Sequence, residues 1–476
     1  MNKNILTYGA KVSSVAELYY APVTTIPPGY TIPLSTNYIF LAKPDPWSDD
    51  NNPPQPTQDQ SFIKSVFKTI FVMKLVTSND ICPVIPRVDW DSGTTYDYYQ
   101  DTIDMFAQDS NGNQILNFYV KNKYDQVFKC LWNNNGGLST DQPYFEPGSY
   151  NTQAIYTGPN DGYKWHYMFT VNSAHKIKFM DSAWIPIPVQ GSLSQGLNIL
   201  NPLFTNNTTG TSVGYGDIEV INVINGGSGY DPANATISVV ITGDGTGAKA
   251  TASANNGSII SVNVTNTGQN YTYANAAIIS TKGSGAVLQI PVSPLGGHGF
   301  DATTELGCAH AMYSVEFNGA ETTQGINMVP TDITYHQVGV VINPTALDTL
   351  PYPANASIYS TTTQLVVASG FGAYQTDELV FQSSDKTLAT AYLSGWVGTV
   401  LSFDATNNVL YVLNTVGTLN LNASVYSNTS GTTRTILNYT TPNLIPQSGY
   451  LAYVENRSGI QRSADGIEQI KIVIGY

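Results

Sequence analysis

The sequence predicts a mainly β protein with a few helices, built as a β-sandwich-like core domain that carries two small inserted β modules. The composition favours strands. Of the residues, 42% are hydrophobic and only 11% are charged, so the surface must be polar through Asn, Thr, Ser, Gln and Tyr. An internal repeat within residues 217–293 indicates one module, and a series of short strands within 362–437 indicates the other.

The N-terminal part opens with a predicted strand and a predicted helix. Residues 38–42 (Tyr-Ile-Phe-Leu-Ala) form an apolar run that predicts a buried strand. The density of proline in 43–56 excludes regular structure there. Apolar side chains then recur every three or four positions, which predicts a helix over 58–77, preceded by a capping box at Thr57-x-x-Gln60.

Two further strands are predicted in the aromatic-rich part of the chain, at 125–132 and 164–171. In the second of these, Trp165, Tyr167 and Phe169 alternate with more polar residues. This period of two is typical of a strand that is buried on one face only.

Residues 217–293 contain two copies of one pattern, spaced by about 41 residues. The segment 221–230 (Ile-Asn-Val-Ile-Asn-Gly-Gly-Ser-Gly-Tyr) aligns with 262–271, and the Gly-rich segment 241–248 aligns with 280–286. Each copy is predicted to run strand, Gly-Tyr turn, strand, Gly-rich turn, strand. Because one copy could not cover its own apolar face, we expect both to form a single β module whose ends lie close together.

Residues 362–437 are predicted to form a small barrel. Strands are expected at Gln364–Ala368, Glu378–Gln382, Ala389–Phe403 and Val409–Leu413, and residues 404–408 (Asp-Ala-Thr-Asn-Asn) give a hairpin signal between the last two. The chain closes with predicted strands at 451–454 and 470–476. The expected core therefore consists of residues 1–216, 294–361 and 438–476.

The charge balance limits the classes of function. Twenty Lys and Arg against 34 Asp and Glu give a net charge of −14, which argues against nucleic-acid binding by neutralisation of phosphates. The sequence has no apolar run long enough to span a bilayer and no signal peptide, and its three Cys are too few for a disulfide framework. We expect a soluble protein made in a cytoplasm.

Several motifs invite a chemical interpretation, and each has a simpler structural one. Gly226–Asp231 matches one calcium-binding β-roll repeat, but such sites need tandem copies, so a tight turn is expected. The Gly-rich residues 243–249 have the wrong spacing for a phosphate loop. His298, Cys308 and His310 lack a second ligand pair with metal-site spacing.

Catalysis finds little support in the sequence. There is no Gly-x-Ser-x-Gly elbow, and the five His are scattered. The sequence leaves open a carboxylate pair for glycoside hydrolysis, because the two carboxylates of such a pair can be far apart in sequence and come together only in the folded protein. The acidic, aromatic stretch from Asp89 to Asp104 would suit a sugar groove or, more simply, a loop covering a core or an interface. We expect no enzyme, no catalytic residue, no cofactor and no metal.

Five segments, in order, resemble the baseplate wedge protein family known as gene product 8 of T-even-type contractile-tailed bacteriophages. The resemblance covers about 1–200, 296–345 and 441–476, and it leaves out the two modules. Two positions depart from the family pattern: Leu451 stands near a usual acidic residue, and Ser458 replaces a usual proline. The segments are Tyr38–Trp47 with Pro53–Thr57, Val84–Trp90, Tyr124–Asn133, Asp161–Phe169 with Trp184–Val189, and Tyr453–Arg457 with Arg462 and Glu468–Ile472.

The resemblance implies a non-enzymatic, dimeric building block that docks against other wedge proteins in a six-fold baseplate, within the virion. The rival interpretation is a host-recognition adhesin or a tail-associated protein that binds or hydrolyses glycans. We expect Arg457 to be a buried anchor that grips a carboxylate or carbonyls through its guanidinium fork. The residues expected to have structural or interface roles are Trp47, Arg87, Asp89, Trp90, Trp165, Glu455, Asn456, Arg457 and Arg462.

Overall fold

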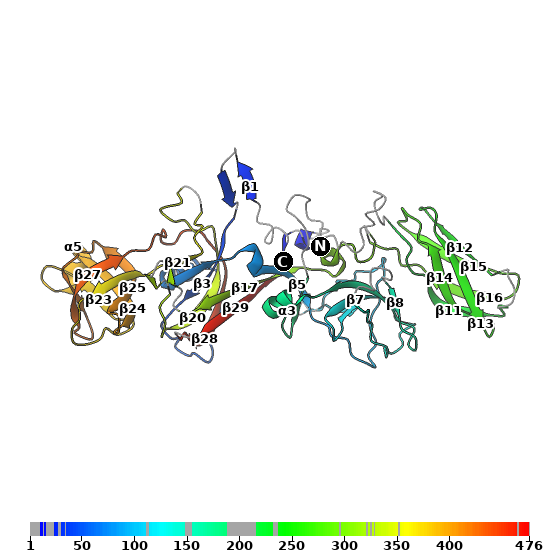
Figure 1. Ribbon diagram of the computed structural model, residues 1–476, viewed down its shortest axis with the longest axis horizontal. Coiled ribbons are helices and arrows are strands. Elements are labelled where there is room, and N and C mark those ends of the chain that lie inside the picture. The colour runs from blue at the N-terminus through cyan, green and yellow to red at the C-terminus, as the bar shows by residue number, and fades with distance from the viewer. Residues whose placement is uncertain are drawn as a thin grey trace. The chain divides into compact units, whose positions relative to one another are not determined.

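The protein is described here from a computed structural model. It divides into two compact units: residues 1–19, 82–312 and 473–476 form the first, and 20–81 and 313–472 form the second. The residues described are 10–12, 14–15, 23–26, 30–33, 35–110, 114–147, 155–187, 216–231, 237–294, 297–319, 322–323, 326–327, 329–350, 353–463 and 466–475. The expected mainly β class is confirmed (Figure 1).

The first unit is built on an antiparallel sheet with the strand order β6-β7-β9-β8. These strands are β6 (Tyr119–Lys121), β7 (Gln126–Trp132), β8 (Ile155–Thr157) and β9 (Lys164–Thr170), so both predicted strands of this region are confirmed. Strands β5 (Ile81–Pro86) and β10 (Trp184–Pro186) also pair antiparallel in this unit. Strands β17 (His310–Asn318) and β29 (Ile467–Gly475) have most of their residues in the second unit. The short helices of the first unit are α3 (Ser173–Phe179) and α4 (Ala302–Glu305).

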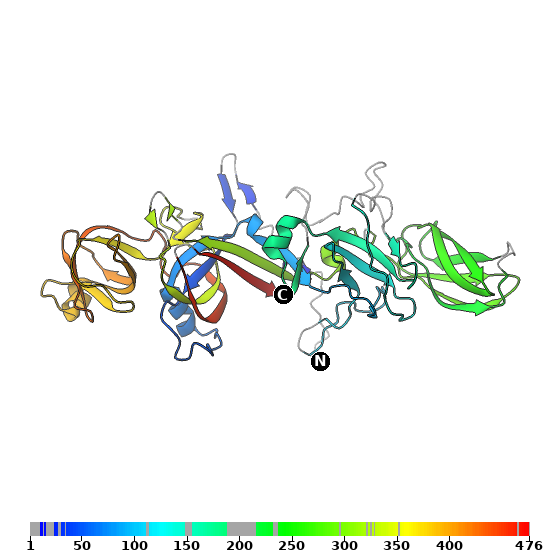
Figure 2. The same cartoon turned by 60° about the horizontal axis from the view of Figure 1, so that its bottom comes forward.

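The repeat within 217–293 forms six strands, three from each copy. Figure 2 shows these strands, in green, gathered into one module. The first copy supplies β11 (Asn222–Ser228), β12 (Ser238–Gly243) and β13 (Lys249–Asn255), and the second supplies β14 (Ser258–Asn266), β15 (Ala274–Ile279) and β16 (Ser284–Gln289). Every pairing joins one copy to the other: β11 with β16, β12 with β15, and β13 with β14. The expected two-copy module is confirmed.

The two Gly-Tyr turns help to hold the two copies of the repeat together. Tyr230 and Tyr271 are buried, and each phenolic oxygen accepts a hydrogen bond from the opposite copy, Tyr230 from the Ala286 N–H at 3.3 Å and Tyr271 from the Ala248 N–H at 3.4 Å. The module's ends also meet, because the Asp217 N–H donates to the Ser293 hydroxyl at 3.0 Å. The predicted closeness of the ends is therefore confirmed.

The second unit contains a five-stranded sheet with the order β21-β4-β3-β20-β28. These strands are β3 (Asn37–Ala42), β4 (Ile70–Leu75), β20 (Thr334–Ile342), β21 (Ile358–Ser360) and β28 (Tyr450–Gln461). Helix α2 (Gln60–Thr69) packs on this sheet through Val66, which is fully buried with Tyr38 and Phe40 of the predicted strand. Smaller elements complete the described parts: β1 (Val23–Ile26), β2 (Tyr30–Pro33), the 3-10 turn Ser78–Asp80, β18 (Thr322–Thr323) and β19 (Ile326–Asn327).

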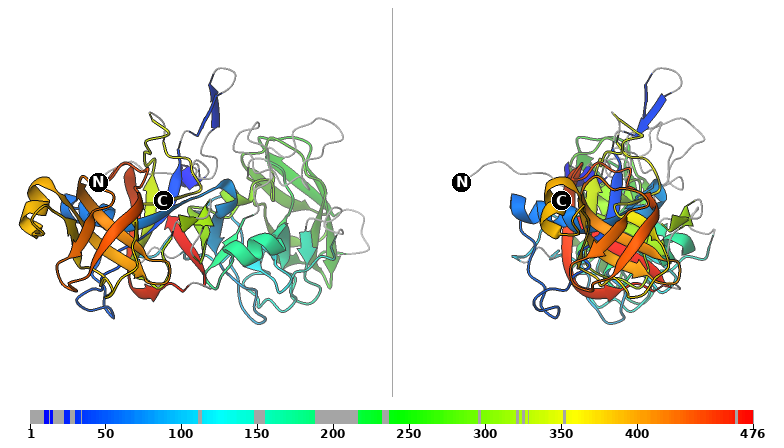
Figure 3. Two further views of the ribbon diagram at one scale, coloured as in Figure 1. Left: turned by 60° about the vertical axis from the view of Figure 1, so that its left-hand side comes forward. Right: turned by 90° about the vertical axis from the view of Figure 1, so that its left-hand side faces the viewer.

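The second inserted module is a closed barrel with the order β22-β25-β24-β23-β26-β27, which confirms the predicted barrel (Figure 3). Its elements are β22 (Thr363–Val367), β23 (Leu379–Gln382), α5 (Leu388–Ser394), β24 (Trp396–Asp404), β25 (Val409–Gly417), β26 (Ser424–Ser427) and β27 (Thr433–Thr440). The core holds Leu365, Trp396 and Leu410 among other apolar side chains. The predicted hairpin at 404–408 joins β24 to β25.

Four expectations differ from the structure. The helix predicted over 58–77 ends at Thr69, because the next six residues pair as β4 with β3 and β21. The strand predicted from Ala389 begins at Trp396, after α5. Strand β9 is buried on both faces, with His166 and Met168 as inaccessible as Trp165. The residues expected to form one core are divided between the two units.

Candidate functional site

A cluster of titratable side chains lies inside the first unit. Lys129 sits in the middle of β7 with no solvent exposure, and its ammonium group donates to Glu305 Oε2 at 2.8 Å and to His298 Nδ1 at 2.9 Å. The Tyr99 ring lies 4.1 Å from the same nitrogen and adds a cation–π contact. The buried positive charge of Lys129 is therefore compensated on several sides.

Glu219 extends the cluster toward the base of the repeat module. Its Oε1 accepts from the His298 backbone N–H at 2.9 Å, and its Oε2 lies 3.4 Å from Nε2 of His166, which is the neighbour of Lys129 across the β7–β9 pair. Burial alone would raise the pKa of Glu219, but His298 and His166 lower that pKa to about 2. Glu219 is therefore ionised at neutral pH.

The same reasoning applies to Glu305 and His298. Burial would raise the pKa of Glu305, but the Lys129 charge and the contact with His298 lower it to about 2. Burial and the Lys129 charge together lower the pKa of His298 to about 4, although the two carboxylates act in the opposite direction. His298 is therefore neutral at pH 7, and Nδ1 accepts from Lys129.

Local structure places Glu305 where Lys129 can reach it. The Asp301 carboxylate caps α4 by accepting from the backbone N–H groups of Thr303 and Thr304. The short helix places the Glu305 carboxylate beside Lys129 of β7. The Asp301 N–H donates to Glu305 Oε1 at 3.3 Å. The cluster fixes α4 against the sheet, and its buried charges make the unit's stability depend on pH.

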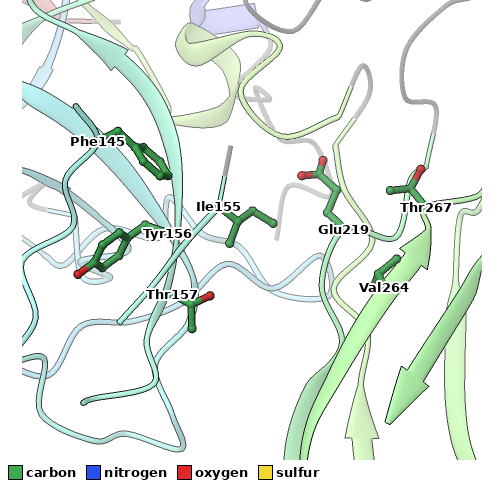
Figure 4. Close-up of a pocket in the computed structure, with 7 residues that line it drawn as sticks. All are labelled: Phe145, Ile155, Tyr156, Thr157, Glu219, Val264 and Thr267. Carbon is green, nitrogen blue, oxygen red and sulfur yellow. The ribbon is translucent and has the colours of Figure 1, made fainter. Parts of the chain in front are cut away.

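An open pocket of about 700 Å³ reaches the edge of this cluster. Figure 4 shows Phe145 and Tyr156 on one side and Glu219, Val264 and Thr267 on the other. Glu219 is the acidic residue that lines this pocket, and its side chain is 17% exposed. Both of its carboxylate oxygens already have partners within the cluster. Over the residues that the structure describes, no group of three or more His, Cys, Asp and Glu is arranged to hold a metal ion.

The expected interface residues near the two ends of the sequence come together in the second unit. Trp47 Nε1 donates to the Arg457 carbonyl at 2.9 Å, and the Asn456 side chain donates to the Pro54 carbonyl at 2.7 Å. Asn456 also accepts from the side chain of Gln337, its partner in the β20–β28 pair, at 2.8 Å. These contacts tie the proline-rich loop after β3 to the edge strand β28.

The buried fork expected at Arg457 is wrong, and Arg462 makes that arrangement instead. The Arg457 side chain is 40% exposed and forms an ion pair with Glu455, with Nε to Oε1 at 3.3 Å. Arg462 is 1% exposed, and its guanidinium donates to Glu468 Oε2 at 2.7 Å, to the Gly319 carbonyl at 2.7 Å and to the Pro330 carbonyl at 3.3 Å. The anchor lies at the end of β28, where surrounding chain covers the side chain.

The remaining expected residues lie in the first unit. The Arg87 side chain donates to Asp89 Oδ2 at 2.9 Å and to the Asp181 carbonyl at 2.7 Å, and Lys121 contacts the other oxygen of Asp89 at 3.1 Å. Trp90 Nε1 donates to the Ser139 hydroxyl at 3.0 Å. These contacts belong to the packing of the unit.

Trp165 is fully buried on β9. Its ring stacks on Tyr163, with the ring centroids 5.5 Å apart, and meets Tyr96 edge-on at 5.4 Å. Tyr96 comes from the acidic stretch considered as a sugar groove, so this part of that stretch covers a core.

The Gly-rich motifs and Cys308, considered above for a chemical role, make structural contacts. Asp231 of the Gly-rich turn lies 3.4 Å from Lys282, and Asp244 accepts hydrogen bonds from the Thr272 and Tyr273 backbones. The Cys308 thiol is buried with its pKa raised to about 12, and it contacts the His310 carbonyl at 3.4 Å.

Most of the buried cluster could not be predicted from the sequence. His298 was a candidate there, but Lys129, His166, Glu219 and Glu305 were not. The one available signal was Lys129, a lysine in the middle of the apolar run Val127-Phe-Lys-Cys-Leu131. No signal joined the cluster's members, because they come from four separate segments.

Compared with known proteins, the chain matches no protein-family model and no curated protein. Among the described residues, no helix has the length and apolar character needed to cross a membrane.

Proposed function

We propose that this chain is a structural subunit of the baseplate wedge in a contractile-tailed bacteriophage, where it links neighbouring wedge proteins during assembly. In this proposal it is made in the host cytoplasm, becomes part of the virion and acts as a homodimer within a six-fold baseplate. It performs no catalysis there and needs no cofactor, nucleic acid or membrane.

The observation that carries the proposal is the way in which the resembling segments meet. Trp47 of the first segment and Arg457 of the last are separated by 410 positions, yet they share a hydrogen bond of 2.9 Å. The contact supports the proposal because it brings the first and last resembling segments together in the fold. In the first unit, the segments around Val84 and Trp184 likewise pair as β5 and β10.

The surfaces of the two inserted modules also support a role in assembly. The barrel exposes large apolar side chains, and so does the repeat module; examples are Phe371, Leu393, Val416, Ile260 and Tyr273. Protein interfaces are enriched in aromatic residues and depleted of Lys and Glu, which matches the low charge of this chain.

The test is deletion of the chain from a phage that encodes it. We expect infected cells to contain no complete tails, because a wedge lacking one subunit cannot close the six-fold ring. The adhesin alternative gives complete tails that fail to adsorb to the host. An antibody against the chain should label the distal end of the tail in particles made with the intact gene. Absence of the chain from purified particles would overturn the proposal.

A further inference from the structure

We propose that Asn256 is a site of spontaneous deamidation, through which the repeat module changes with time into an aspartyl and isoaspartyl form. Asn256 and Gly257 form the two-residue turn that joins β13 to β14, and with it the first copy of the repeat to the second. The reaction needs only water, so the purified chain should undergo it outside any assembly. This inference therefore does not rest on the proposed function.

The chemistry is an attack of a backbone nitrogen on the preceding side chain. The Gly257 nitrogen forms a bond to Cγ of Asn256, and the Cγ–Nδ2 bond breaks. The amide group leaves as ammonia with the proton that the glycine nitrogen loses, which water carries between them. The succinimide ring that results takes up one water and opens at either carbonyl, giving aspartate or isoaspartate. A following glycine favours the attack because it has no Cβ to obstruct the approach.

The geometry of the hairpin requires this labile pair of residues. Asn255 and Ser258 are paired across the turn, and between them Asn256 has a φ of +48° and Gly257 a φ of +81°. Two consecutive positive φ values are those of a type I′ turn, in which Asn-Gly is a preferred pair. The backbone of the turn therefore places a carboxamide next to an unhindered glycine nitrogen.

Both reacting groups are accessible at this turn. The Asn256 side chain is exposed, and among the described residues neither it nor the Gly257 N–H makes a hydrogen bond. The space around Gly257 is open, since an added Cβ would meet no atom closer than the Gly229 backbone nitrogen at 3.5 Å. The carboxamide can therefore turn toward the glycine nitrogen, and water can reach the ring that forms.

Two other Asn-Gly pairs of the chain have an occupied glycine nitrogen. The Gly136 N–H, which follows Asn135, donates to Asn133 Oδ1 at 3.1 Å. The Gly319 N–H, which follows Asn318, donates to a backbone carbonyl at 3.0 Å. In each pair this hydrogen bond has to break before the glycine nitrogen can lose its proton and attack. The fold therefore slows deamidation at both pairs.

A third pair, Asn225 and Gly226, lies within β11 and is held in place by its surroundings. Asn225 Oδ1 accepts from the Gly227 N–H at 2.9 Å, which fixes the carboxamide. A Cβ on Gly226 would lie 2.1 Å from Ser258 Oγ, so this part of the strand leaves no room for a succinimide ring. The remaining pair, at 111–112, lies outside the described residues.

Deamidation at Asn256 should loosen the first Gly-Tyr turn. The Gly257 carbonyl accepts from the Tyr230 N–H at 2.9 Å, so the hairpin and this turn support each other. Isoaspartate leads the main chain through Cβ, which lengthens the turn and removes its type I′ geometry. The new carboxylate also adds negative charge to a chain whose net charge is already −14. The modified module should therefore open more often and be cleaved faster by proteases.

The test follows the purified full-length chain during incubation at mildly alkaline pH. Peptide mapping by mass spectrometry detects deamidation as a gain of about one dalton, and electron-transfer fragmentation separates isoaspartate from aspartate. We expect Asn256 to react about ten-fold faster than Asn135, Asn225 and Asn318, because only Asn256 reaches the geometry of attack without breaking contacts. In urea, where the chain is unfolded, the four should react at similar rates. The proposal is overturned if one of the other three reacts first in the folded chain, or if all four react alike there.

Asn256→Gly is the matched control. Gly-Gly also suits a type I′ turn, and the variant has no carboxamide at this position. Before incubation, proteases should cleave the repeat module of parent and variant at the same rate. After incubation, only the parent should be cleaved faster than before. Equal cleavage of the two once Asn256 has fully reacted would overturn the inferred loosening of the Gly-Tyr turn.

Discussion

Replacement of Arg462 by methionine should strongly destabilise the second unit. Methionine keeps much of the volume but removes the donors that satisfy Glu468 and the carbonyls of Gly319 and Pro330. The Glu468 carboxylate would then be left unpaired in a site where Arg462 is 1% exposed. Breaking a buried ion pair in this way costs about 3–5 kcal/mol.

Differential scanning calorimetry measures this loss as a lower midpoint of the transition in which the second unit unfolds. For a unit of this size, the expected cost lowers that midpoint by roughly 6–20 °C. Arg462→Lys keeps the charge but loses the fork, so it should lie between the methionine variant and the parent.

Arg457→Met is the matched control. Its side chain is 40% exposed and its ion pair with Glu455 spans 3.3 Å near solvent, so its loss should cost less than about 1 kcal/mol. The double variant Arg462→Met/Glu468→Gln should recover stability, since it removes the unpaired charge. The reasoning is refuted if Arg462→Met melts together with the parent, or if Arg457→Met is the more damaging of the two.

Three further predictions concern the first unit. Its free energy of unfolding should fall by up to about 3 kcal/mol as the pH is lowered from 6.5 to 4. The reason is that the pKa of His298 is about 4 in the folded unit, whereas the same histidine takes up a proton near pH 6.5 in the unfolded chain. His298→Gln should flatten the dependence of the melting temperature on pH above 4.5, and an unchanged slope would exclude this role. Gly283→Ala should make proteases cleave the repeat module faster, since a Cβ would lie 2.6 Å from the Tyr230 backbone nitrogen. Gly285→Ala has a similar φ but no atom closer than 3.8 Å to the added Cβ, so its effect should be much smaller. Equal cleavage rates in the two variants would contradict the clash. Replacing 224–287 by Asn-Gly should leave the unit folded, because Val223 and Leu288 are paired neighbours across β11 and β16. Removing all of 217–293 also deletes Glu219 and should lower the melting temperature. Equal melting temperatures of the two deletions in calorimetry would contradict this.

Local patterns identified the elements that complete themselves within a short stretch of chain. The hairpin at 404–408 and the two copies of the repeat are of this kind, because turn residues and strand alternation lie next to each other in the sequence. The predicted helix over 58–77 shows the limit. Its apolar spacing continues to Phe71, but pairing with β3 and β21 turns residues 70–75 into a strand. That pairing depends on segments far away in the chain.

The candidate site was harder to predict for the same reason. Lys129, His166, Glu219 and the pair His298 and Glu305 come from four segments, and no sequence spacing links these segments. Strand β9 appeared to be buried on one face because Trp165 alternates with His166, yet His166 faces the polar cluster rather than water. Arg457 and Arg462 both follow a strand-like run, and only the surrounding chain makes one buried and the other exposed.

The exchange of strands in the repeat module has a consequence for its origin. Among the described residues, a single copy of about 41 residues shows no strand pairing of its own: β11, β12 and β13 pair with β16, β15 and β14. Expressed alone, such a copy could fold only by borrowing these strands from a second molecule, and its folding would depend on protein concentration. Joining two copies in one gene makes that association intramolecular. Within one chain, the module thus has the strand pairing of a dimer whose two halves exchange all their strands.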